Sequence, residues 1–148
     1  MNLIHSLIWM FIGSLIIGLY FNGMNILAYR FNDLYFTSTT LIFSALLMAS
    51  NMCILEILMY YNYSGKFNIN LFLLFLILSI IFIFMLRNQF MVDDTAWLKR
   101  MISHHSTALT TSRKIHNRTK NKKIKQLSSD IIETQEREIK YMKELLYN

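Results

Sequence analysis

Three long apolar runs fill the first part of the chain, and a second part with amphipathic helical periodicity follows them. The runs cover roughly residues 4–29, 36–61 and 69–86. The third run is eighteen residues without a charge, which is close to the minimum length for a helix that crosses a bilayer. None of the runs has the polar face that a helix of a soluble bundle presents to water. The pattern therefore predicts a transmembrane region of three helices within residues 1–87.

The remaining residues, 88–148, repeat apolar positions every three to four residues, which is typical of amphipathic helices. Asp93 or Asp94 can cap a first helix that continues to about His116. After a polar turn, a second helix is expected over about 122–146. The tail of the chain is therefore predicted to be a helical hairpin, and the whole protein is predicted to be all-α.

Each tail helix is expected to bury one apolar stripe. In the first helix the stripe comprises Trp97, Leu98, Met101, Ile102, His105, Ala108 and Leu109. In the second helix it comprises Ile124, Leu127, Ile131, Glu138, Met142 and Leu145, supplemented by Ile132 and Ile139. Two helices make a thin core on their own, and a four-helix bundle built from two chains would bury the stripes better. A homodimer through the tail is therefore predicted.

Charge divides the chain at the same place as hydropathy. From Arg87 onward there are 13 Lys+Arg and 7 Asp+Glu, so this part carries the whole net charge of +6. The first apolar run lacks a basic start and a small-residue cleavage site, so it is expected to be retained as a span rather than removed as a signal peptide. The basic run 113–125 has no interleaved aromatic residues, so nucleic-acid binding is not expected.

The second apolar run carries an acidic residue, Glu56. Met48, Met52, Glu56 and Met59 follow 4-4-3 spacing and share a helix face. A carboxylate at membrane depth must be protonated, paired or exposed to water, so one interpretation is a relay stripe for metal ions or protons. The favoured alternative is a packing face in which methionine fills gaps and Glu56 lies near the headgroups. Cys53 is the sole cysteine and is expected to be a buried apolar residue.

Two adjacent histidines are the clearest candidates for chemistry. Residues three and four apart lie over one another on a helix, so each tail helix presents a set of polar or sulfur-containing side chains on one face. The sets are Met101, His104, His105 and Ala108 on the first helix, and Gln135, Glu138 and Met142 on the second. A hairpin could bring these groups together, and imidazole and thioether are ligands that copper prefers.

The metal hypothesis gives each of these residues a role. His104, His105, Met101 and Met142 are the expected copper ligands, and Glu138 and Gln135 are expected to orient the imidazoles. The alternative is that one of the two histidines packs in the core and the other faces water. His116 lies beside the turn and is expected to face solvent. No Gly-rich phosphate loop, Ser-His-Asp arrangement or paired-Cys motif occurs, so the protein is not expected to be an enzyme.

Residues 92–146 resemble the DUF305 family, whose pattern is a Met-x-x-His-His-x-x-Ala helix followed by a Gln-x-x-Glu-Ile-x-x-Met helix. The two motifs stand here at 101–108 and 135–142, and Ser103 occupies a position where family members commonly have Pro. Through residues 36–60, the apolar part also resembles a bacterial subgroup that places three spans before this domain. The resemblance implies a fold similar to half of a ferritin-like four-helix bundle. It also implies a metal-binding module, since some members are associated with copper.

Two functions of different classes are therefore expected. The first is a membrane-anchored metal-binding protein that handles copper. The second is a structural or interaction membrane protein whose hairpin mediates oligomerisation and whose histidines only pack. The expected partners are the lipid bilayer, a metal ion and a second copy of the chain. Charge counting slightly favours a tail on the inner side of the membrane, whereas the resemblance implies the outer side, and we expect the tail outside.

Overall fold

The computed structural model describes residues 2–147, and every regular element in that range is a helix. The all-α prediction is therefore confirmed. The chain forms two compact units. The membrane unit combines the residues up to Phe21 with 39–91, and the tail unit combines 22–38 with 92–147. We call residues 22–38 the connector, because they stand between two helices of the membrane unit in sequence but pack with the tail.

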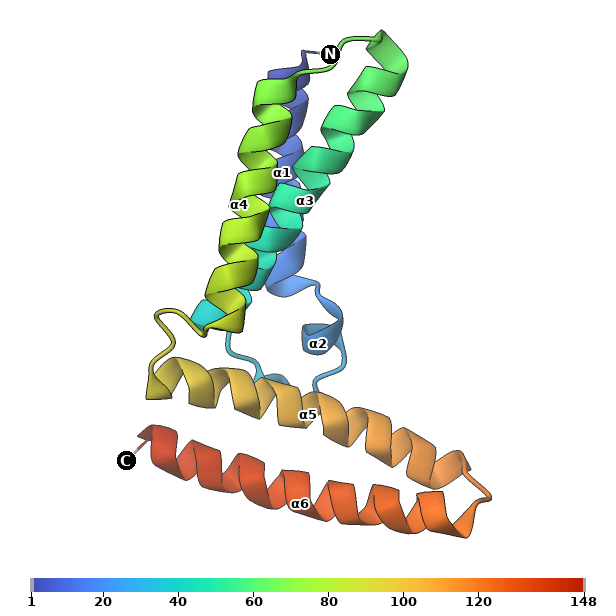
Figure 1. The fold of residues 1–148 in the computed structure, drawn as a ribbon. Helices are drawn as coiled ribbons and strands as arrows, with labels where there is room; N and C mark the ends of the chain where they lie inside the picture. Colours follow the sequence, from blue (N-terminus) through green and yellow to red (C-terminus); the bar gives the residue numbers. More distant parts are fainter. Residues whose placement is uncertain (1, 148) are drawn as a thin grey trace. The chain divides into compact units, whose positions relative to one another are not determined.

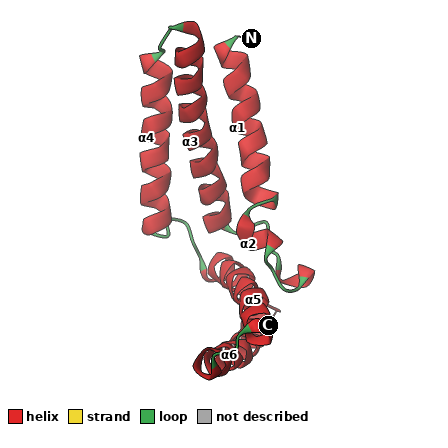
Figure 2. Ribbon diagram, turned by 90° about the vertical axis from the view of Figure 1, so that its right-hand side faces the viewer, coloured by secondary structure: helices red, strands yellow, loops and turns green. Residues whose placement is uncertain are grey.

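The membrane unit consists of α1 (Leu3–Tyr20), α3 (Thr39–Ser64) and α4 (Ile69–Arg87). Figure 2 shows these helices side by side, with α3 between the other two. Three helical stretches of the described chain are long and apolar enough to cross a membrane, as predicted. Most large apolar side chains of the unit are exposed, and Ser79 alone is buried among the described residues of α4. Such a surface suits lipid as its solvent.

Small residues let α1 and α3 approach closely. Ala45, Ala49 and Cys53 of α3 follow one another at four-residue spacing, and all three are buried. On α1, a Cβ added to Gly18 would lie 2.9 Å from both Cα and Cβ of Ala45. Small residues at this spacing are how transmembrane helices bring their backbones into contact. The prediction that Cys53 is a buried apolar residue is confirmed.

Replacing Gly18 with alanine is expected to destabilise the membrane unit by about 1–3 kcal/mol, because the added methyl group forces the two backbones apart. Gly13 is the matched control on the same helix, since a Cβ there meets nothing within 4 Å. Thermal unfolding of each variant in detergent micelles measures the difference. Equal melting temperatures for Gly18→Ala and Gly13→Ala would contradict the close α1–α3 contact.

The predicted first span, 4–29, is not one continuous helix, although the stretch that is long and apolar enough to cross a membrane runs from Leu3 to Ile26. Helix α1 ends at Tyr20, and the chain then enters the connector. The connector contains α2 (Gly23–Ile26) and the 3-10 helix η1 (Phe31–Asp33). The break arises because the Asn22 side chain accepts a hydrogen bond from the Asn25 backbone N–H at 3.0 Å and so caps a new helix. Apolar residues continue through this break, which hides it in the hydropathy pattern. Helix α3 is shifted by three residues toward the C-terminus relative to the prediction.

Glu56 is paired inside the membrane unit. The Ser6 hydroxyl of α1 donates a hydrogen bond to Glu56 Oε1, which gives the carboxylate the partner that it would need inside a bilayer. The two residues line a pocket together with Met59, Tyr60 and Tyr63. Met48 instead packs toward α1, with Cε 3.3 Å from the Cβ position of Gly18. The methionine stripe is thus divided between helix packing and the pocket of Glu56, and its function stays a prediction.

The tail unit is built on an antiparallel hairpin of α5 (Asp94–Arg118) and α6 (Lys122–Tyr147), which lie side by side in Figure 1. Helix α5 begins where the sequence predicts, because Asp93 Oδ1 accepts a hydrogen bond from the Ala96 backbone N–H at 2.7 Å. The predicted bounds of both helices are confirmed to within two residues.

His116 was expected to face solvent, and this prediction is wrong. Its Nδ1 lies 3.2 Å from Ser128 Oγ of α6 and 3.2 Å from the backbone oxygen of Lys125. The side chain therefore bridges the two helices near the turn.

The core between α5 and α6 differs in part from the predicted stripes. Its buried members are Leu98, Ile102, Leu109, Ile139 and Met142. Trp97 is 48% exposed, so it lies outside the core. The predicted stripe of α6 is right for Met142, Ile139 and Ile132, which belong to the core or pack against it. It is wrong for Ile124, Leu127 and Leu145, which are 42%, 59% and 51% exposed. Helix α6 carries two apolar stripes, about a quarter-turn apart at 100° per residue, and periodicity alone does not say which one faces α5.

The connector covers one side of the hairpin. The buried carboxylate of Asp33 accepts a hydrogen bond from Ser106 Oγ of α5 at 2.7 Å and pairs with Lys143 Nζ of α6 at 2.5 Å. The Ser103 hydroxyl donates to the backbone oxygen of Asp33 at 2.7 Å. Ser103 is the residue that replaces the proline common in the similar family, and proline has no hydroxyl to make this contact. Asp33 therefore joins both tail helices to the connector.

A second set of contacts holds the other end of the connector. The Tyr29 backbone N–H donates to Ser106 Oγ at 2.9 Å. The Arg113 guanidinium lies 4.8 Å from the centroid of the Tyr29 ring and pairs with Glu136 at 2.5 Å. The connector is thus a third layer of the tail unit, which the division of the chain into residues 1–87 and 88–148 did not foresee.

Candidate metal site

The centre of the candidate site is a histidine–carboxylate pair between the two tail helices. His105 Nδ1 of α5 lies 3.2 Å from Glu138 Oε2 of α6. The His105 side chain is only 13% exposed, whereas that of Glu138 is 45% exposed. Nδ1 itself is buried and has no partner with hydrogen-bond geometry, so the contact has the distance of an ion pair without the direction of a hydrogen bond.

Burial decides the charge state of His105. Desolvation lowers the pKa of His105 below its ordinary value of 6.5, the Glu138 carboxylate opposes that shift, and neighbouring His104 adds to it. The net effect favours the neutral imidazole at neutral pH. Neutral imidazole is the form that coordinates metal ions.

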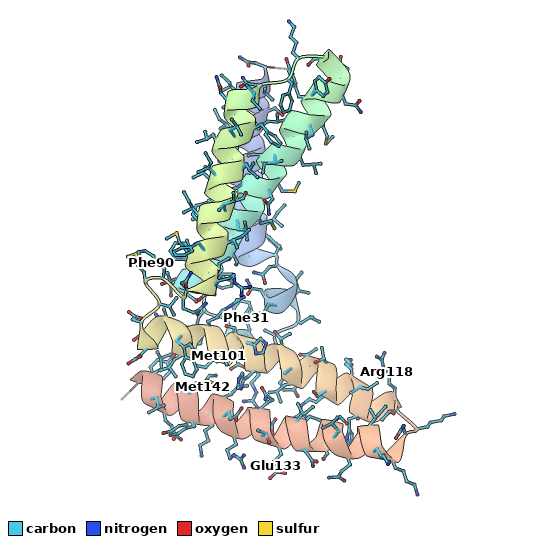
Figure 3. All side chains as sticks on the ribbon, in the orientation of Figure 1. Phe31, Phe90, Met101, Arg118, Glu133 and Met142 are labelled. Atoms are coloured by element: carbon cyan, nitrogen blue, oxygen red, sulfur yellow. The ribbon has the colours of Figure 1, made fainter. Side chains whose placement is uncertain are left out.

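The two methionines of the predicted site come together in the apolar core. Met142 is a buried member of the core, and Met101 is partly buried against it. Figure 3 labels Met101 on α5 and Met142 on α6, on the sides of the two helices that face each other. The structure therefore places both thioethers among apolar side chains, where methionine also serves as a flexible packing residue.

His104 and Gln135 are less constrained. His104 is exposed, and its ring centroid lies 5.8 Å from that of His105 with the planes at 62°. Gln135 is half-buried on α6. Successive residues differ by about 100° around a helix, so one histidine faces α6 while the other faces outward. That division is the one expected if one histidine packs in the core and the other meets water.

The connector fixes the rotation of α5 about its axis. Ser103 and Ser106 lie one turn apart and both bond to Asp33. His104 and His105 stand between these serines in sequence, on other faces of the helix. By holding the serine face toward the connector, Asp33 sets the direction in which both imidazoles point. This role of Asp33 was not predicted, although the small hydroxyl residues at 103, 106 and 107 form a polar stripe that indicates a contact.

A single chain supplies an incomplete coordination set. Within residues 2–147, no three His, Cys, Asp or Glu side chains lie close enough together to hold a metal ion. The pair of His105 and Glu138 supplies one imidazole with a carboxylate beside it. Further donors must come from His104, from a thioether or from outside the chain. Imidazole and thioether donors favour a soft or borderline ion over magnesium or calcium.

Comparison with known proteins finds a domain family that matches the tail. Residues 86–146 match the family described as Domain of unknown function (DUF305). "Uncharacterized protein L153" of Acanthamoeba polyphaga mimivirus is 35% identical over 137 residues, which cover 93% of this chain and 88% of that protein. No solved structure matches the chain. The likeness to the mimivirus protein covers 93% of this chain, so it extends beyond residues 86–146 into the membrane unit.

Proposed function

We propose that this chain, which belongs to the family of that mimivirus protein and carries a DUF305 domain, is a membrane-anchored metal-binding protein that handles copper. His104 and His105 supply imidazole nitrogens, and Met101 and Met142 supply softer thioether ligands. Glu138 and Gln135 orient the imidazoles. The three apolar helices hold this module at a bilayer, with the tail on the outer side of the membrane.

The pair of His105 and Glu138 is the observation that carries the proposal. A carboxylate beside the ring nitrogen of a histidine fixes the imidazole tautomer and its direction, and metal sites use this arrangement widely. Because Nδ1 faces the Glu138 carboxylate, the other ring nitrogen, Nε2, is the one that would coordinate a metal ion. A copper ion would supply a Lewis acid and a one-electron redox centre; the residues here bind it and exclude water from one side.

A copper titration of the full chain in detergent micelles tests the proposal. The full chain is required, because residues 88–148 alone lack the connector that packs with them. Free Cu(I) or Cu(II) at about one hundred times its dissociation constant should stabilise the tail unit by about 2.7 kcal/mol and raise its melting temperature. Magnesium is the control ion, since it prefers oxygen ligands. A melting temperature that copper leaves unchanged would exclude a site in the folded tail.

The second candidate function is a structural or interaction protein of the membrane. It is favoured by the apolar side chains that α6 leaves exposed, among them Ile124, Leu127, Tyr141 and Leu145. In that case the histidines pack and the hairpin binds another chain. Copper would then leave the melting temperature unchanged, while the oligomeric state would depend on the exposed side chains of α6.

A further inference from the structure

Side chains that α6 leaves exposed or half-buried form a second stripe with its own periodicity. Positions 124, 127, 131, 134, 138, 141 and 145 alternate in steps of three and four residues. These positions are occupied by Ile124, Leu127, Ile131, Thr134, Glu138, Tyr141 and Leu145. The spacing is that of a coiled-coil seam, in which the first and fourth positions of each heptad face another helix. We call this set the open stripe.

The open stripe lies beside the face that packs on α5, and Glu138 borders both, since its carboxylate also lies 3.2 Å from His105 of α5. Ile139 and Met142 face α5 and are buried at 3% and 6% exposure, whereas Leu127 and Tyr141 are 59% and 60% exposed. The polar contacts that Arg30, Asp33 and Tyr35 of the connector make with α6 go to Glu136, Lys143 and Tyr147. At 100° per residue these contacts lie on the opposite side of the α5-facing residues from the open stripe. A helix with two apolar stripes about a quarter-turn apart is typical of a four-helix bundle, where each helix has two neighbours.

We propose that the open stripe binds the open stripe of a second copy of this chain, with the two α6 helices antiparallel. Ile124 of one copy then lies against position 141 of the other, Leu127 against position 138, and Ile131 against position 134. The two hairpins together form a four-helix bundle related by a two-fold axis. This inference does not depend on copper binding.

Charges beside the open stripe match in this register. The residues directly before the first position of each heptad are Lys123, Asp130, Arg137 and Glu144. In an antiparallel pair such flanking positions meet one another. Asp130 of each copy meets the position of Arg137 in the other, and Lys123 meets the position of Glu144. The two-fold axis repeats each contact, so four pairs of opposite charge flank the interface.

The neighbouring register is disfavoured by the same charges. A slip of one heptad would bring Arg137 against the same residue of the other copy and Asp130 against Glu144. Like charges that meet across a helix pair are repulsive. A parallel pair would place Asp130 and Arg137 beside the uncharged positions 135 and 142. Only the antiparallel register with Asp130 opposite Arg137 turns every flanking charge into an attraction.

Charge reversal tests the partner and the register together. Asp130→Arg places two Arg–Arg contacts in the homodimer, and Arg137→Asp places two Asp–Asp contacts there. Each variant alone should dimerise about tenfold more weakly or worse, because two attractions become two repulsions. A mixture of the two variants should form a heterodimer, and the double variant Asp130→Arg/Arg137→Asp should recover the homodimer. Mass photometry of the full chain in detergent measures all four samples.

The control variants keep the change in net charge and move it away from the stripe. Glu133→Arg alters charge as Asp130→Arg does, and Lys122→Asp alters it as Arg137→Asp does. Both replaced residues are exposed, and both controls should dimerise like the parent. Circular dichroism confirms that each variant is helical.

A monomeric parent, a dimer that neither reversal weakens, or a double variant that stays dissociated would each overturn the proposal. If the parent is a monomer and a spin label at residue 127 becomes shielded from water when lipid vesicles are added, the open stripe binds the bilayer surface instead.

Discussion

Replacing Asp33 with alanine is expected to lower the free energy of unfolding of the tail unit by about 3 kcal/mol or more. The Asp33 side chain is 1% exposed and that of Lys143 is 26% exposed. The substitution leaves a largely buried ammonium group without its counter-charge, and it also removes the acceptor of the Ser106 hydroxyl. For a unit of this size the melting temperature should fall by more than about 10 °C in detergent.

Two further variants separate loss of the ion pair from loss of packing. The double variant Asp33→Ala/Lys143→Met should recover much of the stability, because replacing both members of a buried pair by apolar groups is often nearly neutral. The surface pair of Lys140 and Glu144 is the matched control, with side chains 82% and 55% exposed. Lys140→Met should change stability by less than about 1 kcal/mol. If Asp33→Ala melts like Lys140→Met, the connector does not hold the hairpin.

Helix positions could be predicted from the sequence where a local signal marks them. Asp93 is a strong capping residue directly before an amphipathic repeat, and α5 begins there. The third apolar run is bounded by Asn68, whose side chain caps α4 at the Leu71 backbone N–H. In both cases the information lies within four residues of the helix end, so no knowledge of the fold is needed.

The connector could not be predicted, because its structure depends on distant residues. Asp33 pairs with a lysine 110 residues later and with a serine 73 residues later. Hydropathy placed Asp33 in a short loop between two spans, where a charged residue is ordinary. One signal was present in α5: Ser103, Ser106 and Thr107 place three small hydroxyl groups on one side of a helix, which is typical of a surface that another segment covers.

The candidate site was predicted in part. Positions 105 and 138 were expected to meet, and the distance of 3.2 Å confirms that they do. The rotation of α6 was not predictable, because its two apolar stripes have similar length and composition. Which stripe faces α5 is decided by packing against Leu98, Ile102 and Leu109, and periodicity carries no information about that choice. The metal itself stays a prediction.

Replacing both His104 and His105 with alanine is expected to abolish copper binding by the full chain. These residues supply the only imidazoles of the proposed site, and imidazole is its strongest neutral donor. Glu138→Gln should weaken binding by roughly ten- to a hundredfold, since the amide orients the ring less strongly than the carboxylate. Glu133→Gln is the control, because Glu133 is an exposed carboxylate on the same helix. It should bind copper like the parent.

The pH dependence gives an independent readout of the same site. Burial lowers the pKa of His105 below 6.5, so its imidazole stays neutral, and able to bind copper, as the pH falls through that value. Removing the Glu138 charge removes the influence that raises the pKa of His105. Glu138→Gln should therefore lose affinity and yet shift the acid limit of binding by His105 to lower pH. Isothermal titration calorimetry between about pH 5 and 7.5, near the unperturbed histidine value, measures both effects. If the double-alanine variant binds copper as tightly as the parent, the site lies elsewhere, and the stripe of Met48, Met52, Glu56 and Met59 is the next to test.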